Sequence, residues 1–246
     1  MNGEEKTQLL EDIVLLGQVG PEMGDADVDA LMERVPRLFR LICKEAGYDQ
    51  KKIQAVITKF RDSGRRSPPR SAFSKKGPGR PKDGKDGNRA NRWELQSDHK
   101  YYATKRDAKL VEIKYYLQAL SFEEAPTVDH PGAAGAFTWL LGHELKSGEY
   151  NDPILLRTPN FKVFLQKPRL MTSGHLVPLA RGGMHQPGNT YLMLDRANTM
   201  QNDLTFDEFM AVIDDILRRQ GSESIFPDSK NLPSDQFLEG IASTVE

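Results

Sequence analysis

Apolar residues recur at helical spacing through the first quarter of the chain. One short stripe spans residues 9–15, and a second runs from Val28 to Ile42. A third stripe ends at Phe60 and is preceded by Asp49, whose carboxylate can cap a helix. The pattern therefore predicts three helices in residues 1–62. They form either a small helical bundle or dimerisation unit, or a helix-turn-helix reader of DNA.

The period changes several times after residue 98. Helical spacing returns in residues 100–121 and again from Ala133 to Leu145. Apolar and polar residues then alternate from Phe161 onward, which predicts a strand. Thr205 and Glu208 form a capping-box pattern in front of an apolar face, which predicts a last helix. The whole pattern predicts an α+β chain.

Residues 63–92 interrupt the apolar pattern. This window holds ten basic and two acidic residues, a net charge of +8, with Gly, Pro and Ser between them. Such a segment cannot bury enough apolar surface to fold alone, so we expect a flexible, disordered basic linker over residues 63–98. The net charge of the whole chain is only −1, so the basic character is local.

Composition excludes several classes of protein. The single cysteine, Cys43, rules out an internal disulfide and a zinc knuckle with paired cysteines. Because Cys43 falls in the apolar stripe of the second helix, we expect it in the core. No run reaches the roughly 18 apolar residues of a membrane span, and the first residues do not form a secretory signal. We therefore expect a soluble protein that stays where it is made.

One segment combines a histidine with amide side chains at short range. His175 lies in a short apolar run that ends in an Arg-Gly-Gly turn, Asn189 opens a second strand-like run, and Asn198 lies in the helical stretch that follows. Two strands and a helix can bring these side chains into one concavity. There a neutral imidazole can take a proton from water, and oxygen atoms can bind a hard cation. Each residue also has a purely structural interpretation, as a core histidine, a turn residue or a polar residue on a helix surface.

The same residues resemble the HNH endonuclease family, which carries a ββα-metal module. The run is Gly174-His175-Leu176-Val177-Pro178 followed by Gly182-Gly183, with Asn189 fourteen residues after the histidine and Asn198 nine residues further on. The resemblance covers about residues 160–218. It implies that His175 is the general base, that Asn189 holds the loop and orients the backbone of His175, and that Asn198 is a ligand of a divalent metal cation, Mg²⁺ or Mn²⁺.

Position 174 departs from the family pattern, which usually places Asp or His there as the second metal ligand. Because Gly174 has no side chain, Asp195, Asn202, His185 or a backbone carbonyl with waters would have to substitute. Otherwise metal binding is weak. By itself, His185 is expected as an exposed loop residue. The resemblance thus implies a metal-dependent DNA endonuclease that hydrolyses phosphodiester bonds. The alternative is a catalytically degenerate HNH-like protein that binds DNA or has a regulatory role.

The basic linker contains a second motif. Gly79-Arg80-Pro81-Lys82 resembles the AT-hook, whose Gly-Arg-Pro core lies in the minor groove of A·T-rich DNA. A narrow minor groove concentrates negative potential and favours an inserted arginine. We expect DNA contacts from the basic side chains Lys75, Lys76, Arg80, Lys82 and Arg181. A solvated linker without a function is the other interpretation.

The expected organisation has five parts. These are a helical N-terminal region in residues 1–62, the basic linker in 63–98, a helical segment in 99–150, the HNH-like ββα module in 151–222 and a weakly ordered tail in 223–246. DNA is the expected partner, no membrane is involved, and the N-terminal helices offer a surface for self-association. The family resemblance implies a cytoplasmic location in a bacterial or phage-infected cell, or a nuclear one in a eukaryote.

Overall fold

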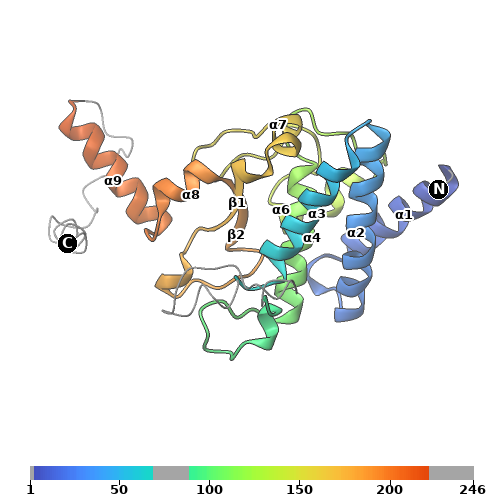
Figure 1. Cartoon of the computed structure of the whole chain (residues 1–246), viewed down its shortest axis with the longest axis horizontal. Helices are drawn as coiled ribbons and strands as arrows, with labels where there is room; N and C mark the ends of the chain where they lie inside the picture. The colour runs from blue at the N-terminus through green and yellow to red at the C-terminus, as the bar shows by residue number, and fades with distance from the viewer. Residues whose placement is uncertain (1–2, 69–88, 222–246) are drawn as a thin grey trace. The chain divides into compact units, whose positions relative to one another are not determined.

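The computed structural model describes residues 3–68 and 89–221 of the chain (Figure 1). Helices predominate, and the described residues hold one two-stranded antiparallel sheet, which confirms the α+β class. The chain divides into two compact units, Met1–Asp203 and Leu204–Glu246. None of the described helices combines the length and the apolar character that crossing a membrane requires.

The elements of the first unit follow one another in the order α1 to α8, with short 3-10 helices labelled η between them. Their bounds are α1 Gly3–Val19, η1 Gly20–Glu22, α2 Asp25–Glu45, α3 Gln50–Gly64, η3 Arg92–Glu94, α4 Lys105–Ala119, α5 Ala133–Ala136, α6 Thr138–Leu141, α7 Phe161–Gln166, η4 Pro168–Leu170, β1 Met171–His175, η5 Leu179–Arg181, β2 Thr190–Leu194 and α8 Asp195–Gln201.

The three N-terminal helices form as predicted. Asp49 caps α3 by accepting a hydrogen bond from the backbone N–H of Lys52 at 3.0 Å, and Cys43 is buried in α2. α2 and α3 both pack against α4, and α1 packs against α2 (Figure 1). The apolar faces of these helices therefore belong to a core that continues through α4 and α7 to the strands, rather than to a separate bundle.

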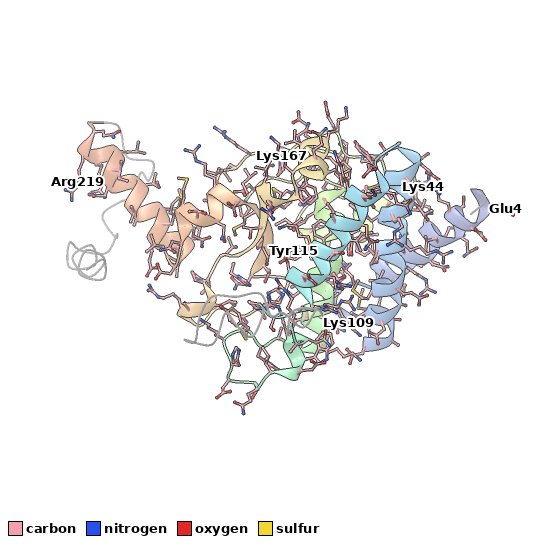
Figure 2. All side chains as sticks on the ribbon, viewed as in Figure 1. Glu4, Lys44, Lys109, Tyr115, Lys167 and Arg219 are labelled. Atoms are coloured by element: carbon pink, nitrogen blue, oxygen red, sulfur yellow. The ribbon has the colours of Figure 1, made fainter. Side chains whose placement is uncertain are left out.

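Helix α4 is the centre of the first unit. Every residue from Ala108 to Ala119 is buried, which is typical of a helix that is packed on all sides. It contacts α2 and α3 as well as strand β2. Tyr115 lies in the middle of this packing (Figure 2), and its hydroxyl forms a hydrogen bond with the Ser173 hydroxyl of β1. The N-terminal helices and the strands are thus joined through α4.

The polar residues inside α4 have partners, as buried polar groups require. Glu112 pairs with Arg65 at the end of α3. Lys114 donates a hydrogen bond to the Pro187 carbonyl at 2.6 Å, and its ammonium lies 3.5 Å from the centre of the Tyr191 ring. Burial lowers the pKa of Lys114 to about 7. These contacts fasten the loop between β1 and β2 to the central helix.

Strands β1 and β2 form an antiparallel hairpin in which Ser173 pairs with Leu192 and His175 with Thr190. The outer edge of β2 is covered by side chains. The Leu192 N–H donates to Gln118 Oε1 at 3.1 Å, and the Leu194 N–H donates to Asp152 Oδ2 at 2.6 Å. A hairpin with one edge paired in this way needs no third strand on that side.

Two predicted elements are wrong. Residues 161–166 form helix α7 instead of a strand, because the Asn160 side chain caps the first turn by accepting from the Val163 N–H at 3.1 Å. Its buried residues, Phe161, Phe164 and Leu165, follow a helical period that the alternating pattern concealed. The helix expected from Ala133 to Leu145 is two short helices, α5 and α6, and Gly142 ends the second with a positive φ of 80°.

The second unit is described up to residue 221 and consists of helix α9, Phe206–Arg219. The predicted capping box is present. The Thr205 side chain accepts from the Glu208 N–H at 3.3 Å, and the Glu208 carboxylate accepts from the Thr205 N–H at 2.8 Å. The expected weakly ordered tail, residues 223–246, lies outside the described residues.

Candidate active site

A hydrogen-bonded pair of histidines lies at the end of β1. The distance from His175 Nε2 to His185 Nδ1 is 3.1 Å, and His185 Nε2 lies 2.8 Å from the Gly64 carbonyl oxygen at the end of α3. A carbonyl oxygen only accepts, so His185 Nε2 carries a hydrogen and its Nδ1 is an acceptor. His175 must then donate from Nε2, which leaves a lone pair on its Nδ1.

Both histidines are held in the neutral form. Burial and then the positive charge of Arg92 lower the pKa of His175 to about 4. The same two causes, in the same order, lower the pKa of His185 well below its usual value. At neutral pH, Nδ1 of His175 is therefore unprotonated, and this atom has no hydrogen-bond partner among the described residues.

The environment of His185 corrects the expectation that it is an exposed loop residue. Only 1% of its surface is exposed. Its loop folds back onto the end of α3, where the Gly64 carbonyl accepts from the imidazole. The hydrophobic pattern carries no signal for this contact, because the two residues are 121 positions apart.

Asn189 is buried and braces the loop that joins β1 to β2. Its Oδ1 accepts from the Val177 N–H at 2.8 Å, and its Nδ2 donates to the carbonyls of Val177 and Met184, each at 2.9 Å. The predicted Gly-Gly turn lies within this braced loop. A Cβ atom on Gly183 would lie 1.9 Å from the Val177 carbonyl oxygen, so no other residue fits there.

Gln201 is a residue of this site that the sequence did not reveal. It lies at the end of α8, is buried, and its Nε2 donates to the His175 carbonyl at 3.1 Å and to the Leu176 carbonyl at 2.9 Å. It therefore ties the backbone of His175 to α8 on the side away from β2.

His175 and Asn198 line the same cleft, which has a volume of about 390 Å³. Thr172 and Ser173 of β1 also line it. The cleft brings the predicted base and the predicted metal ligand together, as the sequence pattern required. Charged residues from before and after residues 69–88 also line it, namely Asp62, Arg66, Arg89, Arg92 and Asp203.

Position 174 has no room for a metal-ligating side chain. A Cβ atom on Gly174 would lie 2.2 Å from Met193 Sδ and 2.8 Å from Asn198 Oδ1. A side chain here would require the buried Met193 to move, so the structure gives Gly174 a role in packing. Because Met193 fills this space, any metal must be held from elsewhere in the cleft.

The remaining oxygen donors of the cleft are of the type that hard cations prefer. Asn198 and Asn202 offer amide oxygens, and Asp203 offers a carboxylate. Within residues 3–68 and 89–221, no three His, Cys, Asp or Glu side chains gather into a cluster that could hold a metal by themselves. By donor chemistry the cleft fits a divalent cation that keeps several waters, as Mg²⁺ usually does.

The predicted DNA-binding residues fall in two places. Arg181 is exposed at the end of η5, within the braced loop. Lys75, Lys76, Arg80 and Lys82 lie outside the described residues. The AT-hook-like motif therefore stays a prediction.

Comparison with known proteins leaves the family open. No family model matches the chain, and no curated protein matches it. Among solved structures, the chain is similar to one described as the crystal structure of a type II restriction endonuclease, with 18% sequence identity and a TM-score of 0.41. The similarity covers 50% of this chain and 55% of that chain, so this chain spans about half the length of that enzyme. A TM-score of this size assigns no activity, and the function is therefore inferred from the site.

Proposed function

We propose that this protein is an endonuclease that hydrolyses phosphodiester bonds in DNA, with His175 as the general base. The observation that carries the proposal is the histidine pair at the cleft. The bond from His175 Nε2 to His185 fixes which nitrogen is protonated and leaves Nδ1 as the acceptor. The order of β1, β2 and α8 around this histidine agrees with the HNH-like spacing of His175, Asn189 and Asn198.

In the proposed reaction, Nδ1 of His175 takes a proton from the water that attacks phosphorus. A new P–O bond forms, the bond to the leaving oxygen breaks, and that oxygen takes a proton from solvent. His185 accepts the hydrogen bond of the imidazolium that results, and Asn189 and Gln201 keep the backbone around His175 in place. A general base typically contributes about 10²- to 10⁴-fold to the rate.

The low pKa of His175 makes it a weak base in the unliganded protein. A phosphate group in the cleft would offset the positive charge of Arg92 and raise this pKa toward neutrality, where a base is most effective. When bound, a divalent cation would stabilise negative charge on the phosphate. Asn198 would be its ligand, with Asp203 as the carboxylate in the same cleft.

The test is nicking of supercoiled plasmid DNA with Mg²⁺ or Mn²⁺, with EDTA in a parallel reaction. We expect nicking only with the cation and a loss of at least about 100-fold for His175→Ala. His130→Ala is the matched control, because His130 is also partly buried but does not line the cleft. Nicking by His175→Ala at the rate of the unaltered protein would refute the assignment of the base.

A second candidate function is DNA binding without cleavage. The packing of Met193 against Gly174 favours it, because it removes the usual place of a metal ligand. In this case the protein would bind DNA and leave the plasmid intact with every cation.

The basic residues outside the described part belong to either function. We propose that Arg80 reads the minor groove and that Lys75, Lys76 and Lys82 contact phosphates, with Arg181 as a further contact. Arg80→Ala should then reduce the preference for A·T-rich over G·C-rich duplexes in a binding titration. An unchanged preference would refute the interpretation of this motif as an AT-hook.

A further inference from the structure

Arg66 and two arginines more than twenty residues further along the chain, Arg89 and Arg92, line the same cleft. Arg66 and Asn91 form an isolated antiparallel bridge. The Ser67 N–H donates to the Ala90 carbonyl at 2.9 Å, and the Arg92 N–H donates to the Arg65 carbonyl at 2.9 Å. This pairing joins the end of α3 to the start of η3 and places Arg66, Arg89 and Arg92 on the lining of the cleft.

Arg92 is 5% exposed, and neutral groups hold it. Its Nε donates to the Gly64 carbonyl at 3.0 Å, Nη1 to the Tyr101 carbonyl at 3.2 Å and Nη2 to the Ser63 carbonyl at 3.3 Å. A guanidinium has five N–H donors, so one N–H remains on each Nη. The three carbonyls fix the plane of the group but leave its charge uncompensated.

Arg89 adds a second positive charge near Arg92. Burial first, and the nearby charge of Arg89 as a lesser cause, lower the pKa of Arg92 to about 10. In the part of the chain that the structure describes, neither Arg89 nor Arg92 forms an ion pair with a carboxylate. Asp62, an acidic residue of the lining, is paired instead with Arg61 at 3.3 Å and Arg66 at 3.7 Å.

Two neighbouring guanidiniums without a counter-ion, one of them buried, are unfavourable unless an anion binds between them. A guanidinium presents paired N–H groups that match the oxygens of a phosphate. Arg92 and His185 both donate to the Gly64 carbonyl, at 3.0 Å and 2.8 Å, which places this wall close to the histidine pair.

We propose that Arg89 and Arg92 form a subsite for a phosphate group of the nucleic-acid backbone, beside His175 in the same cleft. The inference rests on the proposed function for the identity of the ligand. The subsite itself is made of described residues, because Arg89 and Arg92 lie just before and just after Asn91 of the Arg66–Asn91 bridge.

The experiment measures binding of the full-length protein to a short fluorescent DNA duplex in EDTA, at several salt concentrations. Arg89→Ala should weaken binding by about tenfold and reduce the slope of log K against log salt by about 0.9, the value for one phosphate contact. Arg157→Ala is the matched control, because it removes the same charge from an exposed arginine outside the cleft. We expect Arg157→Ala to bind like the unaltered protein.

Arg92→Ala can fail to fold because it removes three buried hydrogen bonds to backbone carbonyls, so Arg92→Lys is the second variant. It keeps the charge but not the paired N–H groups, and we expect it to weaken binding as well. Inorganic phosphate is the second probe. It should shift the His175 imidazole signal in NMR spectra of the unaltered protein and do so less in Arg89→Ala.

Two outcomes would overturn the subsite. In one, Arg89→Ala and Arg92→Lys both bind with unchanged affinity and slope. In the other, Arg157→Ala weakens binding as much as Arg89→Ala, which would show a general effect of charge. Plasmid nicking is scored separately. Weakened binding by Arg89→Ala in a protein that never nicks DNA would support the subsite and refute the nuclease, and unchanged binding in a protein that nicks would do the reverse.

Discussion

Replacing His185 tests the arrangement on which the proposed mechanism depends. In the structure, His185 Nδ1 accepts from His175 and His185 Nε2 donates to the Gly64 carbonyl. His185→Leu removes both hydrogen bonds. The His175 N–H is left as a donor without a partner, whereas the Gly64 carbonyl still accepts from Arg92 Nε at 3.0 Å. One such unpaired group costs about 1–3 kcal/mol, so we expect a loss of about 1–3 kcal/mol in the free energy of unfolding.

The catalytic effect should be separate from the loss of stability. Without His185, the proton of His175 is no longer confined to Nε2, and the ring is no longer held in one orientation. We expect kcat for plasmid nicking to fall by about 10- to 100-fold, which is part of the 10²- to 10⁴-fold that a general base contributes. The assay is nicking at saturating Mn²⁺, at a temperature where urea titrations show that the variant is folded.

Two polar substitutions at position 185 separate the two hydrogen bonds. In His185→Asn, the amide oxygen lies near the former place of Nδ1 and can still accept from His175. In His185→Gln, the amide nitrogen lies near the former place of Nε2 and can still donate to the Gly64 carbonyl. We expect His185→Asn to keep more activity than His185→Gln at similar stability. The opposite order, or full activity of His185→Leu, would refute the assigned tautomer of His175.

Three further predictions follow from the same geometry. Gly174→Ala should lower the free energy of unfolding by about 1–3 kcal/mol in a urea titration, because its Cβ would lie 2.2 Å from Met193 Sδ. Adding Met193→Ala should recover part of the loss. A Gly174→Ala variant as stable as the unaltered protein would contradict this packing. The pKa of His175 is about 4 in the folded protein and its ordinary value is 6.5, so protonation favours the unfolded state. The free energy of unfolding should be highest above pH 6.5 and fall by up to about 3 kcal/mol as the pH drops to about 4. A flat profile between these pH values would refute the burial of a neutral imidazole. Asn198→Ala should raise the Mn²⁺ concentration needed for half-maximal nicking, whereas Asn189→Ala should lower the thermal midpoint with no rescue by metal, and equal rescue of both would show that the two roles are wrong.

Local signals in the sequence predicted local structure well. Asp49 and Thr205 cap the helices that they were expected to cap, because a cap depends only on the next three residues. The Gly-Gly turn and Asn189 also lie together in one loop, because turn chemistry is local. The failure at residues 161–166 has the same origin. Apolar residues at positions 161, 163 and 165 alternate within this short window, whereas the residues that are buried, Phe161, Phe164 and Leu165, have helical spacing.

The parts of the site that the sequence did not predict depend on contacts between distant segments. His185 is buried because its loop contacts Gly64. Arg92 is buried because its guanidinium donates to carbonyls before and after residues 69–88. No hydrophobic period or short motif in the sequence predicts contacts between such distant residues. Met193 lies in the strand-like run that Asn189 opens, and no pattern in the sequence marks it as the group that occupies the space beside Gly174.

The HNH-like resemblance covers about residues 160–218, but the chemistry of His175 is set largely from outside it. The hydrogen bond that fixes its tautomer passes through His185 to the end of α3, and the charge that lowers its pKa belongs to Arg92 in η3. Both of those elements pack against α4, which also anchors the β1–β2 loop through Lys114. The helices before residue 120 therefore shape the chemistry of this histidine. They determine whether it is neutral, which nitrogen carries the proton, and which positive charges line the cleft.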